Sequence, residues 1–150
     1  MVYLRFMASK TKAYLHFVFR TKLRLPLLFN SLRIELCEFL RHKAKTLNCE
    51  IIAINGYADH IHLLVELDKE MSISDFARIL KGSSSRWINS KRVFGELLFR
   101  WQRGYYCESV SRQLLVKVMN YIKHQQVKHL DQEVEESLKD LEEFYISLDV

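Results

Sequence analysis

Residues 60–67, HIHLLVEL, constrain the fold most, because apolar side chains recur there at every second position. The apolar members of this alternation are Ile61, Leu63, Val65 and Leu67. A period of two fits a strand, in which successive side chains point to opposite faces. The segment therefore predicts a strand with one apolar face that belongs against a helix. His60 and His62 then lie together on the other face.

Further elements are predicted along the rest of the chain. Alternation or apolar content predicts strands at 12–24, at 50–58 and just after Gly104, and Asn55-Gly56 has the composition of a turn before the strand at 60–67. The predicted helices are 30–48 with a cap at Asn30 or Ser31, 72–91 opened by Ser72 and Asp75, one from Ser109 or Ser111 to about Leu130, and 131–144. The order βαββαβα indicates an α+β domain. We expect a ferredoxin-like or RRM-like antiparallel sheet with helices packed on it, plus a C-terminal tyrosine-bearing helix.

Length and composition favour one domain, with 1–130 as its main body and 131–150 as an acidic C-terminal helix or tail of the same domain. No apolar run reaches the roughly 18 to 20 residues that a membrane span needs. The N-terminus lacks a signal-peptide pattern. The three cysteines have no CxxC spacing, and an odd count suits a reducing compartment. We expect a cytoplasmic protein without a membrane partner.

Charge is distributed unevenly along the chain. Residues 1–45 carry ten Lys and Arg against two Glu, and residues 91–130 carry eight against two Glu. The last twenty residues carry one basic residue against eight acidic ones. Aromatic residues are interleaved with the basic segments, a pattern typical of surfaces that bind polyanions such as single-stranded nucleic acid. A basic surface that is merely solvated is the alternative.

The histidine pair could hold a metal ion, because His60 and His62 can converge on one point. A zinc centre would want another His or Cys, and the cysteines offer no matching spacing. Magnesium or manganese accepts oxygen ligands and retains waters, so an amide or carboxylate could complete the site. An HxH pattern alone is a weak signal, and the alternative is that one imidazole caps a loop while the other packs.

The helix at 111–129, SRQLLVKVMNYIKHQQVKH, offers such an amide. Tyr121 and Gln125 are four residues apart, so they lie on one helical face, and Gln125 falls within the apolar stripe, where it needs a partner. The alternative is a tyrosine at the core edge beside a hydrogen-bonded glutamine. Two imidazoles and an amide are neutral, so a bound ion would retain its double charge for a phosphate oxygen. The phenol, with an ordinary pKa near 10, could then act as a nucleophile.

These motifs together resemble a known family. His60-Ile61-His62 in DHIHLLVEL, followed some sixty residues later by NYIKHQ, resembles the single-tyrosine HUH transposases of small prokaryotic insertion sequences. This is the IS-two-hundred/IS-six-hundred-and-five group, with its relatives associated with repetitive extragenic palindromes. The segments HFVFRTKLR, LKGSSSRW, WQRGY and SVS also occur in the order of that family, so the resemblance covers most of the chain.

The resemblance implies roles for these residues. His60, His62 and Gln125 would bind Mg²⁺ or Mn²⁺, and Tyr121 would be the nucleophile. The family implies a homodimer that cuts single-stranded DNA near hairpins at element ends and forms a 5′-phosphotyrosine. It then rejoins the strands, and the tyrosine helix of one subunit often completes the site of the other. A prokaryotic, nucleoid-associated protein follows from this function.

Some positions depart from the pattern of the family. Ala58 stands where proline usually precedes Asp-His, and His124 stands where asparagine often precedes the glutamine. Lys128-His129 replaces a His-His pair. His124 could assist proton transfer or be a solvated helix residue. The three ligands and the tyrosine are present, so activity is expected.

Other residues are candidates for supporting roles. Those for contacts with the DNA backbone are Arg20, Lys22 and Arg24 at the end of the first strand, followed by Arg100 and Arg103. Trp101 or Tyr105 could stack on an unpaired base, with core packing as the alternative for Trp101. Asp59 could orient a metal-bound imidazole or only shape the turn.

Two other function classes stay open. The first is a non-catalytic DNA-hairpin binder derived from such an enzyme. The second is an RRM-like RNA module or a two-histidine phosphodiesterase. The phosphodiesterases need two separated HxT/S motifs, which this chain lacks, and an RRM would carry exposed aromatic residues where this chain has His60 and His62.

Overall fold

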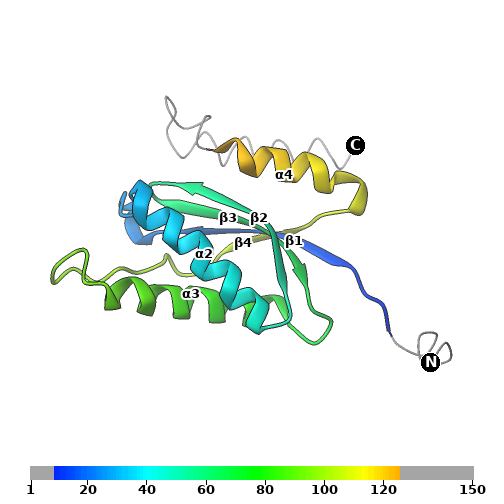
Figure 1. Ribbon diagram of the computed structural model, residues 1–150, viewed down its shortest axis with the longest axis horizontal. Helices are drawn as coiled ribbons and strands as arrows, with labels where there is room; N and C mark the ends of the chain where they lie inside the picture. Colours follow the sequence, from blue (N-terminus) through cyan, green and yellow to red (C-terminus); the bar gives the residue numbers. More distant parts are fainter. Residues whose placement is uncertain (1–8, 126–150) are drawn as a thin grey trace.

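β3 (His60–Leu67) lies inside a four-stranded antiparallel sheet in the computed structural model, which describes residues 9–125 (Figure 1). The sheet order is β2-β3-β1-β4. The elements in chain order are β1 (Ala13–Arg20), the short 3-10 helix η1 (Lys22–Arg24), α2 (Asn30–Thr46), β2 (Glu50–Tyr57), β3, α3 (Ile73–Ser90), β4 (Tyr106–Ser109), the 3-10 helix η2 (Arg112–Leu114) and α4 (Leu115–Lys123). This βαββαβ order, followed by a helix, confirms the predicted α+β fold with a ferredoxin-like sheet.

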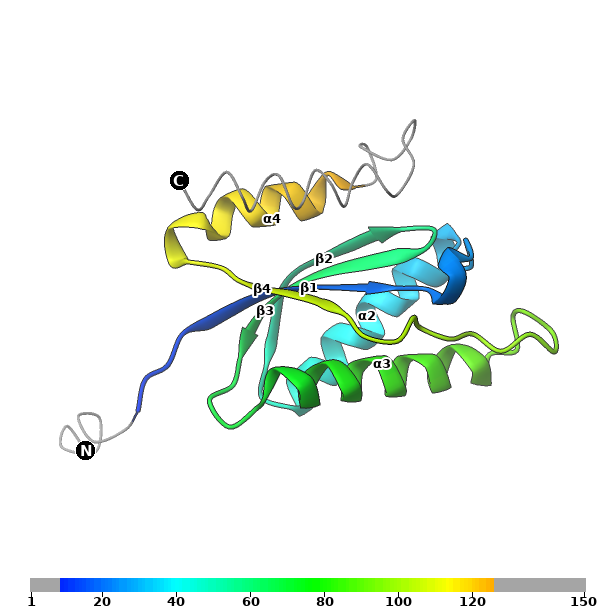
Figure 2. The ribbon, with the colours of Figure 1, turned by 180° about the vertical axis from the view of Figure 1, so that it is seen from behind.

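α2 and α3 cover one face of the sheet and form the larger core with it (Figure 2). Phe17 and Phe19 of β1 and Ile61, Leu63 and Val65 of β3 are fully buried there. Phe17 pairs with Leu63 and Phe19 with Ile61, and side chains of paired residues point to the same side. The apolar face predicted from the alternation is confirmed.

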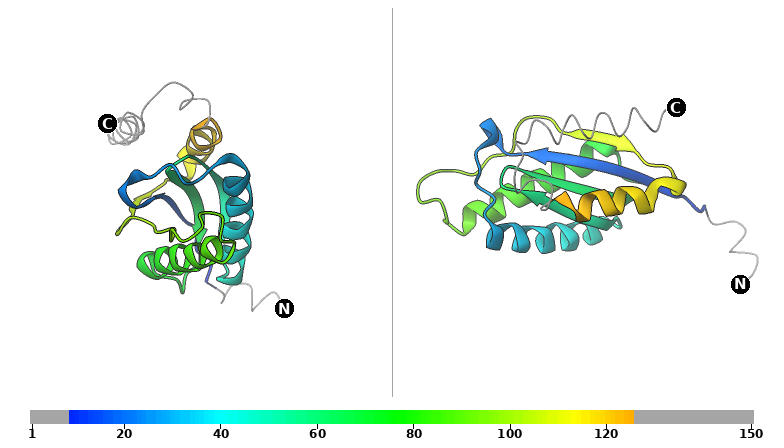
Figure 3. Two further views of the ribbon diagram at one scale, coloured as in Figure 1. Left: turned by 90° about the vertical axis from the view of Figure 1, so that its left-hand side faces the viewer. Right: turned by 90° about the horizontal axis from the view of Figure 1, so that it is seen from above.

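α4 covers the opposite face of the sheet (Figures 1 and 3). Val118 and Ile122 of this helix are buried in a smaller apolar cluster with Ala53, Leu64 and Val110. The molecule therefore has three layers: two helices, the sheet and a single helix. The polar side of β3 lies between the sheet and α4.

The first strand is shorter than the sequence predicted. β1 ends at Arg20, and the chain enters η1, where Leu23 and Arg24 have φ values of 56° and 53°. Lys22 and Arg24 are therefore in a tight turn and do not continue the strand. The turn follows from backbone contacts: Thr21 N donates to the Asp59 carbonyl, and Lys22 N donates to the Arg100 carbonyl.

The prediction of a turn at Asn55-Gly56 is wrong. Both residues lie within β2, and the hairpin to β3 turns at Ala58 and Asp59. A Cβ atom on Gly56 would collide with the carbonyl oxygen of His60. This glycine is therefore needed for the close approach of two strands.

The observed starts of the helices agree only in part with the starts predicted from the sequence. The Ser72 cap is confirmed, because Asp75 N donates to Ser72 Oγ at 3.1 Å. α2 has Phe29 at its N-cap position, and the Asn30 side chain instead accepts a hydrogen bond from Arg33. η2 precedes α4, so the last described helix begins at Leu115.

The predicted helix at 131–144 and the division at residue 130 lie outside the described residues. Within residues 9–125, the helices do not combine the length and apolar character that crossing a membrane requires.

Candidate active site

The two histidines of β3 lie on the face of the sheet that α4 covers. His60 pairs with Arg20 of β1 and Tyr57 of β2, and His62 pairs with Asn55 of β2. The two imidazole centroids are 5.0 Å apart, with their planes at 85°. The side chains are 1% and 0% exposed, and both Nε2 atoms are buried. Strand geometry thus brings the two rings together, as the alternation predicted.

Each imidazole has a neighbour at its Nδ1 atom. Asp59 Oδ1 lies 2.9 Å from His60 Nδ1. His16 Nε2 lies 3.1 Å from His62 Nδ1. For Asp59 to orient the imidazole of His60, it would need this contact.

The place of His16 in the site was missed from the sequence. His16 lies on the same face of β1 as Arg20, since both are at even positions of the strand, but only the register of β1 against β3 brings it to His62. His16 is fully buried, and this burial lowers its pKa to about 3. The ring is therefore neutral near pH 7.

Tyr121 lies beside the histidine pair and comes from α4 of the same chain. Its ring centroid is 6.0 Å from that of His62, with the planes at 87°. Asn55 Nδ2 donates to the Lys123 carbonyl at 3.0 Å, which joins the C-terminal end of α4 to β2. The half-buried phenol is therefore held next to the buried imidazole of His62.

Gln125 follows Tyr121 by one helical turn and is fully buried. Its Nε2 atom lies 3.5 Å from the Tyr121 carbonyl, so the carboxamide folds back along the helix. The predicted proximity of Gln125 to Tyr121 is confirmed. That Gln125 binds a metal ion together with the two histidines stays a prediction. Its amide oxygen is the atom that could bind the ion.

The available donor atoms fit a hard divalent ion. Among residues 9–125, no group of three His, Cys, Asp or Glu side chains could hold a metal. An amide oxygen could join the histidine pair at a metal site, and Gln125 carries one within the buried layer. Mg²⁺ and Mn²⁺ accept amide oxygens and waters, whereas protein zinc sites usually take three or four His, Cys or carboxylate ligands.

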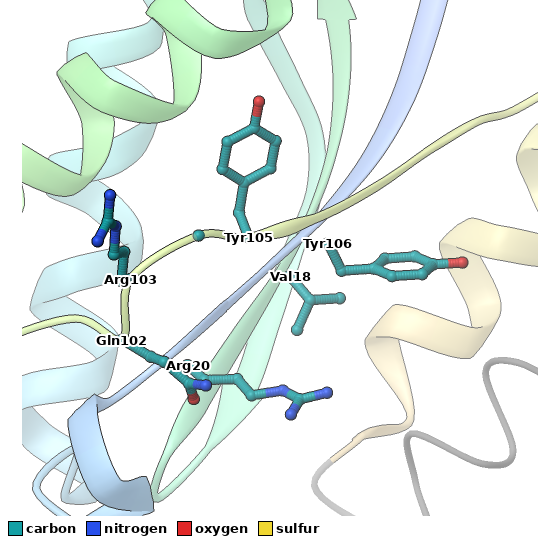
Figure 4. A pocket seen from close by; sticks show the side chains of 7 residues that line it. Val18, Arg20, Gln102, Arg103, Tyr105 and Tyr106 are labelled. Carbon is teal, nitrogen blue, oxygen red and sulfur yellow. The ribbon is translucent and has the colours of Figure 1, made fainter.

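A hollow of about 320 Å³ opens beside β1 (Figure 4), and two residues that line it, Val18 and Arg20, pair with His62 and His60 of β3. Its lining residues are Val18, Arg20, Gln102, Arg103, Gly104, Tyr105 and Tyr106. Figure 4 shows Arg20 and Tyr106 pointing toward α4, and Arg103 and Tyr105 pointing away from it, toward α3. Guanidinium groups bind phosphate, and aromatic rings stack on unpaired bases, so the hollow has groups suited to single-stranded nucleic acid.

The two predicted sets of basic residues, 20–24 and 100–103, contribute jointly to two hollows. Arg20 and Arg103 line the hollow beside the histidines, whereas Lys22 and Arg100 line a second hollow of about 410 Å³ near η1. The backbone bond from Lys22 N to the Arg100 carbonyl, 2.9 Å long, brings the second pair together. Arg24 lies in the same turn as Lys22.

The surroundings of Trp101 and His124 show whether these two candidates lie in the core or at the surface. Trp101 is 8% exposed, and its indole Nε1 donates to Ser84 Oγ at 2.9 Å, so it packs in the core. His124 is exposed, and its Nδ1 atom lies 2.6 Å from the Asn120 carbonyl. The position of His124 agrees with a solvated helix residue.

Comparison with known proteins identifies relatives in sequence. Residues 9–125 match the family model described as "Transposase IS200 like". The transposase for insertion sequence element IS200 from Salmonella typhimurium is 36% identical over 116 residues, which cover 73% of this chain and 74% of that protein. The ISDra2 transposase TnpA of Deinococcus radiodurans is 28% identical over 119 residues, covering 75% of this chain and 84% of that protein.

Solved structures share the fold. A putative transposase from Deinococcus radiodurans R1 is similar with a TM-score of 0.63 and 26% identity, covering 79% of this chain and 94% of that chain. A REP-associated tyrosine transposase bound to a REP hairpin has a TM-score of 0.61 and 18% identity, covering 82% of this chain and 72% of that chain. At that lower identity, the likeness supports the fold.

Proposed function

Because this chain belongs to the IS200-like transposase family, we propose that it cleaves and rejoins single-stranded DNA beside hairpins at the ends of an insertion sequence. Transposases of this family are DNA-cleaving and rejoining enzymes, and they depend on a metal ion. For this chain, Tyr121 is the proposed nucleophile. The proposed ligands are His60, His62 and Gln125, and the proposed ion is Mg²⁺ or Mn²⁺.

The position of Tyr121 beside His62 carries this proposal. The two rings are 6.0 Å apart, although 59 residues separate them in the chain. Tyr121 also packs at the edge of the smaller apolar cluster, and its ring meets the buried imidazole of His62 edge-on. A phosphate placed between the ring pair and the phenol could contact both, which is the arrangement that nucleophilic attack requires.

The phenol of Tyr121 loses its proton to solvent as its oxygen attacks the phosphorus, and the bond from phosphorus to the 3′ oxygen breaks. That oxygen takes up a proton and leaves as a 3′-hydroxyl, so the protein carries a 5′-phosphotyrosine. Attack by a 3′-hydroxyl on this linkage rejoins the DNA and returns a proton to Tyr121. An ion held by three neutral ligands would keep its double charge and polarise the scissile phosphate.

DNA would approach along the side of the sheet where β1 ends. Arg20 is next to His60 in the sheet, so it is placed to contact a phosphate close to the one being cut. Tyr105, which is 41% exposed, could stack on an unpaired base. Arg103, Lys22, Arg24 and Arg100 would extend the path along the two hollows. The REP-associated relative was solved bound to a hairpin, and we extend hairpin binding to this chain.

We also propose a homodimer, with each tyrosine acting in its own subunit in the conformation described. The packing of α4 on β2 and β3 of the same chain, with the Tyr121 ring beside His62 of that chain, supports this arrangement. Mixing Tyr121→Phe protein with His62→Ala protein tests this arrangement. The mixture should stay inactive, whereas recovered cleavage would show that the tyrosine helix works in the partner subunit.

The main test is incubation with hairpin-bearing single-stranded DNA and Mg²⁺ or Mn²⁺. We expect cleavage and a covalent protein–DNA adduct on a denaturing gel. His60→Ala, His62→Ala and a chelator should each abolish both, because two remaining ligands hold the ion poorly. Gln125→Ala should weaken cleavage more mildly, with recovery in excess manganese.

His42→Ala is the matched control for loss of a histidine, since His42 is exposed on α2, and it should cleave normally. Full cleavage by the double histidine variant in chelator would remove the metal role. Hairpin binding without any cleavage would make the chain a non-catalytic hairpin binder.

A further inference from the structure

His16 has no role in the proposed chemistry, yet it sits against one of the proposed ligands. It is fully buried on β1, and its ring centroid is 5.3 Å from that of His62. The contact joins His16 Nε2 to His62 Nδ1 at 3.1 Å, which is hydrogen-bond distance. A role for His16 would add a residue to the proposed metal site, so it rests on that proposal.

An imidazole that binds a metal ion through one nitrogen carries its ring proton on the other, so the position of this proton decides which nitrogen of His62 can bind a metal. If His62 Nδ1 carries the proton and donates to His16, His62 Nε2 has a lone pair. If His16 donates, the proton of His62 is on Nε2, and that nitrogen cannot be a ligand. The tautomer of His62 is therefore set by its neighbour.

The hydrogen bond of His60 shows which tautomer of His62 allows both imidazoles to bind one ion. A carboxylate can only accept, so the 2.9 Å contact with Asp59 Oδ1 makes His60 Nδ1 the donor and gives His60 Nε2 the lone pair. Both Nε2 atoms are buried, and the rings adjoin. Two nitrogens can bind one ion only if both present lone pairs, so His62 must also donate through Nδ1.

We infer that His16 is a positioning residue that accepts the Nδ1–H of His62 and so holds Nε2 of His62 ready for the metal ion. Its own proton is then on Nδ1. A neutral acceptor suits this position, because a second buried carboxylate beside Asp59 would offset the positive charge needed at the phosphate. The two ligands are thus oriented by unlike groups, one charged and one neutral.

Two substitutions separate this role from packing. In His16→Gln, the side-chain amide oxygen can take the place of Nε2 and accept the same hydrogen bond. His16→Leu fills similar space but offers no acceptor. Circular dichroism and thermal melting establish that both variants fold, and His42→Leu controls for loss of an exposed histidine on α2.

The first measurement is the tautomer of His62 in the metal-free protein, from long-range proton–nitrogen NMR. We expect the Nδ1–H form in wild type and His16→Gln, and loss of that preference in His16→Leu. The second is Mn²⁺ affinity by electron paramagnetic resonance. His16→Leu should bind about 10- to 100-fold more weakly, the usual effect of losing an orienting partner, and His16→Gln should stay close to wild type.

An Nε2–H tautomer in wild type would overturn the inference, as would His16→Leu protein that is folded and binds manganese like wild type. A wild-type protein that binds no manganese, while His16 still controls the tautomer of His62, would instead refute the proposed metal site. In that outcome the hydrogen-bond assignment stands.

Discussion

At the residue scale, burial and hydrogen bonding fix the orientation of the two imidazoles in the candidate site. His60 is held from the hairpin turn by Asp59, and His62 is held across the sheet by His16. Neither partner belongs to the HxH motif itself. Asp59 precedes it in sequence and could be suspected, whereas His16 is 46 residues away from His62 and becomes a neighbour only through strand pairing.

Burial of His16 makes stability depend on pH. Its pKa is about 3 in the folded chain, because burial disfavours the charged ring, and near 6.5 when unfolded. The unfolded state therefore binds the extra proton first as the pH falls below about 6.5, so stability present above that pH is lost toward pH 3. Between pH 6.5 and 5, the metal-free protein should lose about 2 kcal/mol through this group.

Urea unfolding at the two pH values measures this loss. His16→Gln should show a smaller difference in unfolding free energy between them than wild type. His42→Gln should keep the wild-type difference, since His42 is exposed. Equal differences in wild type and His16→Gln would show that His16 does not titrate abnormally.

At the element scale, the hairpin of β2 and β3 builds the site. A β-bulge between Ile51 and Ala53 shifts the register of β2, so that Ala53 and Asn55 share the face of β3 that carries His62. Asn55 then reaches the end of α4 through its bond to the Lys123 carbonyl. The Asn55-Gly56 pair has the composition of a turn, yet here one residue anchors a helix and the other lets two strands approach.

Gly56→Ala should therefore damage the hairpin. The added Cβ would meet the backbone of His60, which cannot move aside without shifting this proposed metal ligand. We expect a loss of about 1–3 kcal/mol in unfolding free energy, typical of overpacking, and weaker Mn²⁺ binding. Urea denaturation and manganese titration measure the two effects.

Gly82→Ala is the matched control. A Cβ there meets only the Arg86 side chain at 3.5 Å, an ordinary contact, within α3. Alanine is the better helix former by up to about 1 kcal/mol, so this variant should be as stable as wild type or more so. A Gly56→Ala protein as stable as Gly82→Ala would contradict the close-approach explanation.

At the scale of the whole molecule, the two faces of the sheet have separate tasks. One face makes the apolar core with α2 and α3, and the other holds the site beneath α4. The fold class and the facing of the histidines were predictable, since both follow from periodicity along the chain. The contact of His16 with His62, the position of the hairpin turn and the regrouping of the basic residues around two hollows depend on strand register and backbone packing, which periodicity does not encode.

Salt dependence tests the proposed DNA path across the molecule. Lys22 and Arg100 line one hollow, and both side chains are exposed. If each binds one phosphate of a single strand, replacing both with alanine should reduce the slope of log K against log salt by about 1.4 in magnitude. Binding should be measured in a Tyr121→Phe background to prevent cleavage.

Lys43→Ala with Lys45→Ala is a control of equal charge in the last turn of α2, on the face opposite α4. The slope for this pair should match that of the parent protein. If the Lys22 and Arg100 replacements also leave the slope unchanged, the path of the strand does not include that hollow.

The central claim is that one phenol carries the DNA, and peptide mapping of a trapped adduct tests it most directly. After incubation with hairpin-bearing single-stranded DNA and Mn²⁺, the nucleotide should be found on Tyr121. Tyr121→Phe removes only the hydroxyl, so the variant should fold and bind the hairpin but give neither cleavage nor adduct. A nucleotide on Tyr105 or Tyr106, or normal cleavage by Tyr121→Phe, would contradict the assignment.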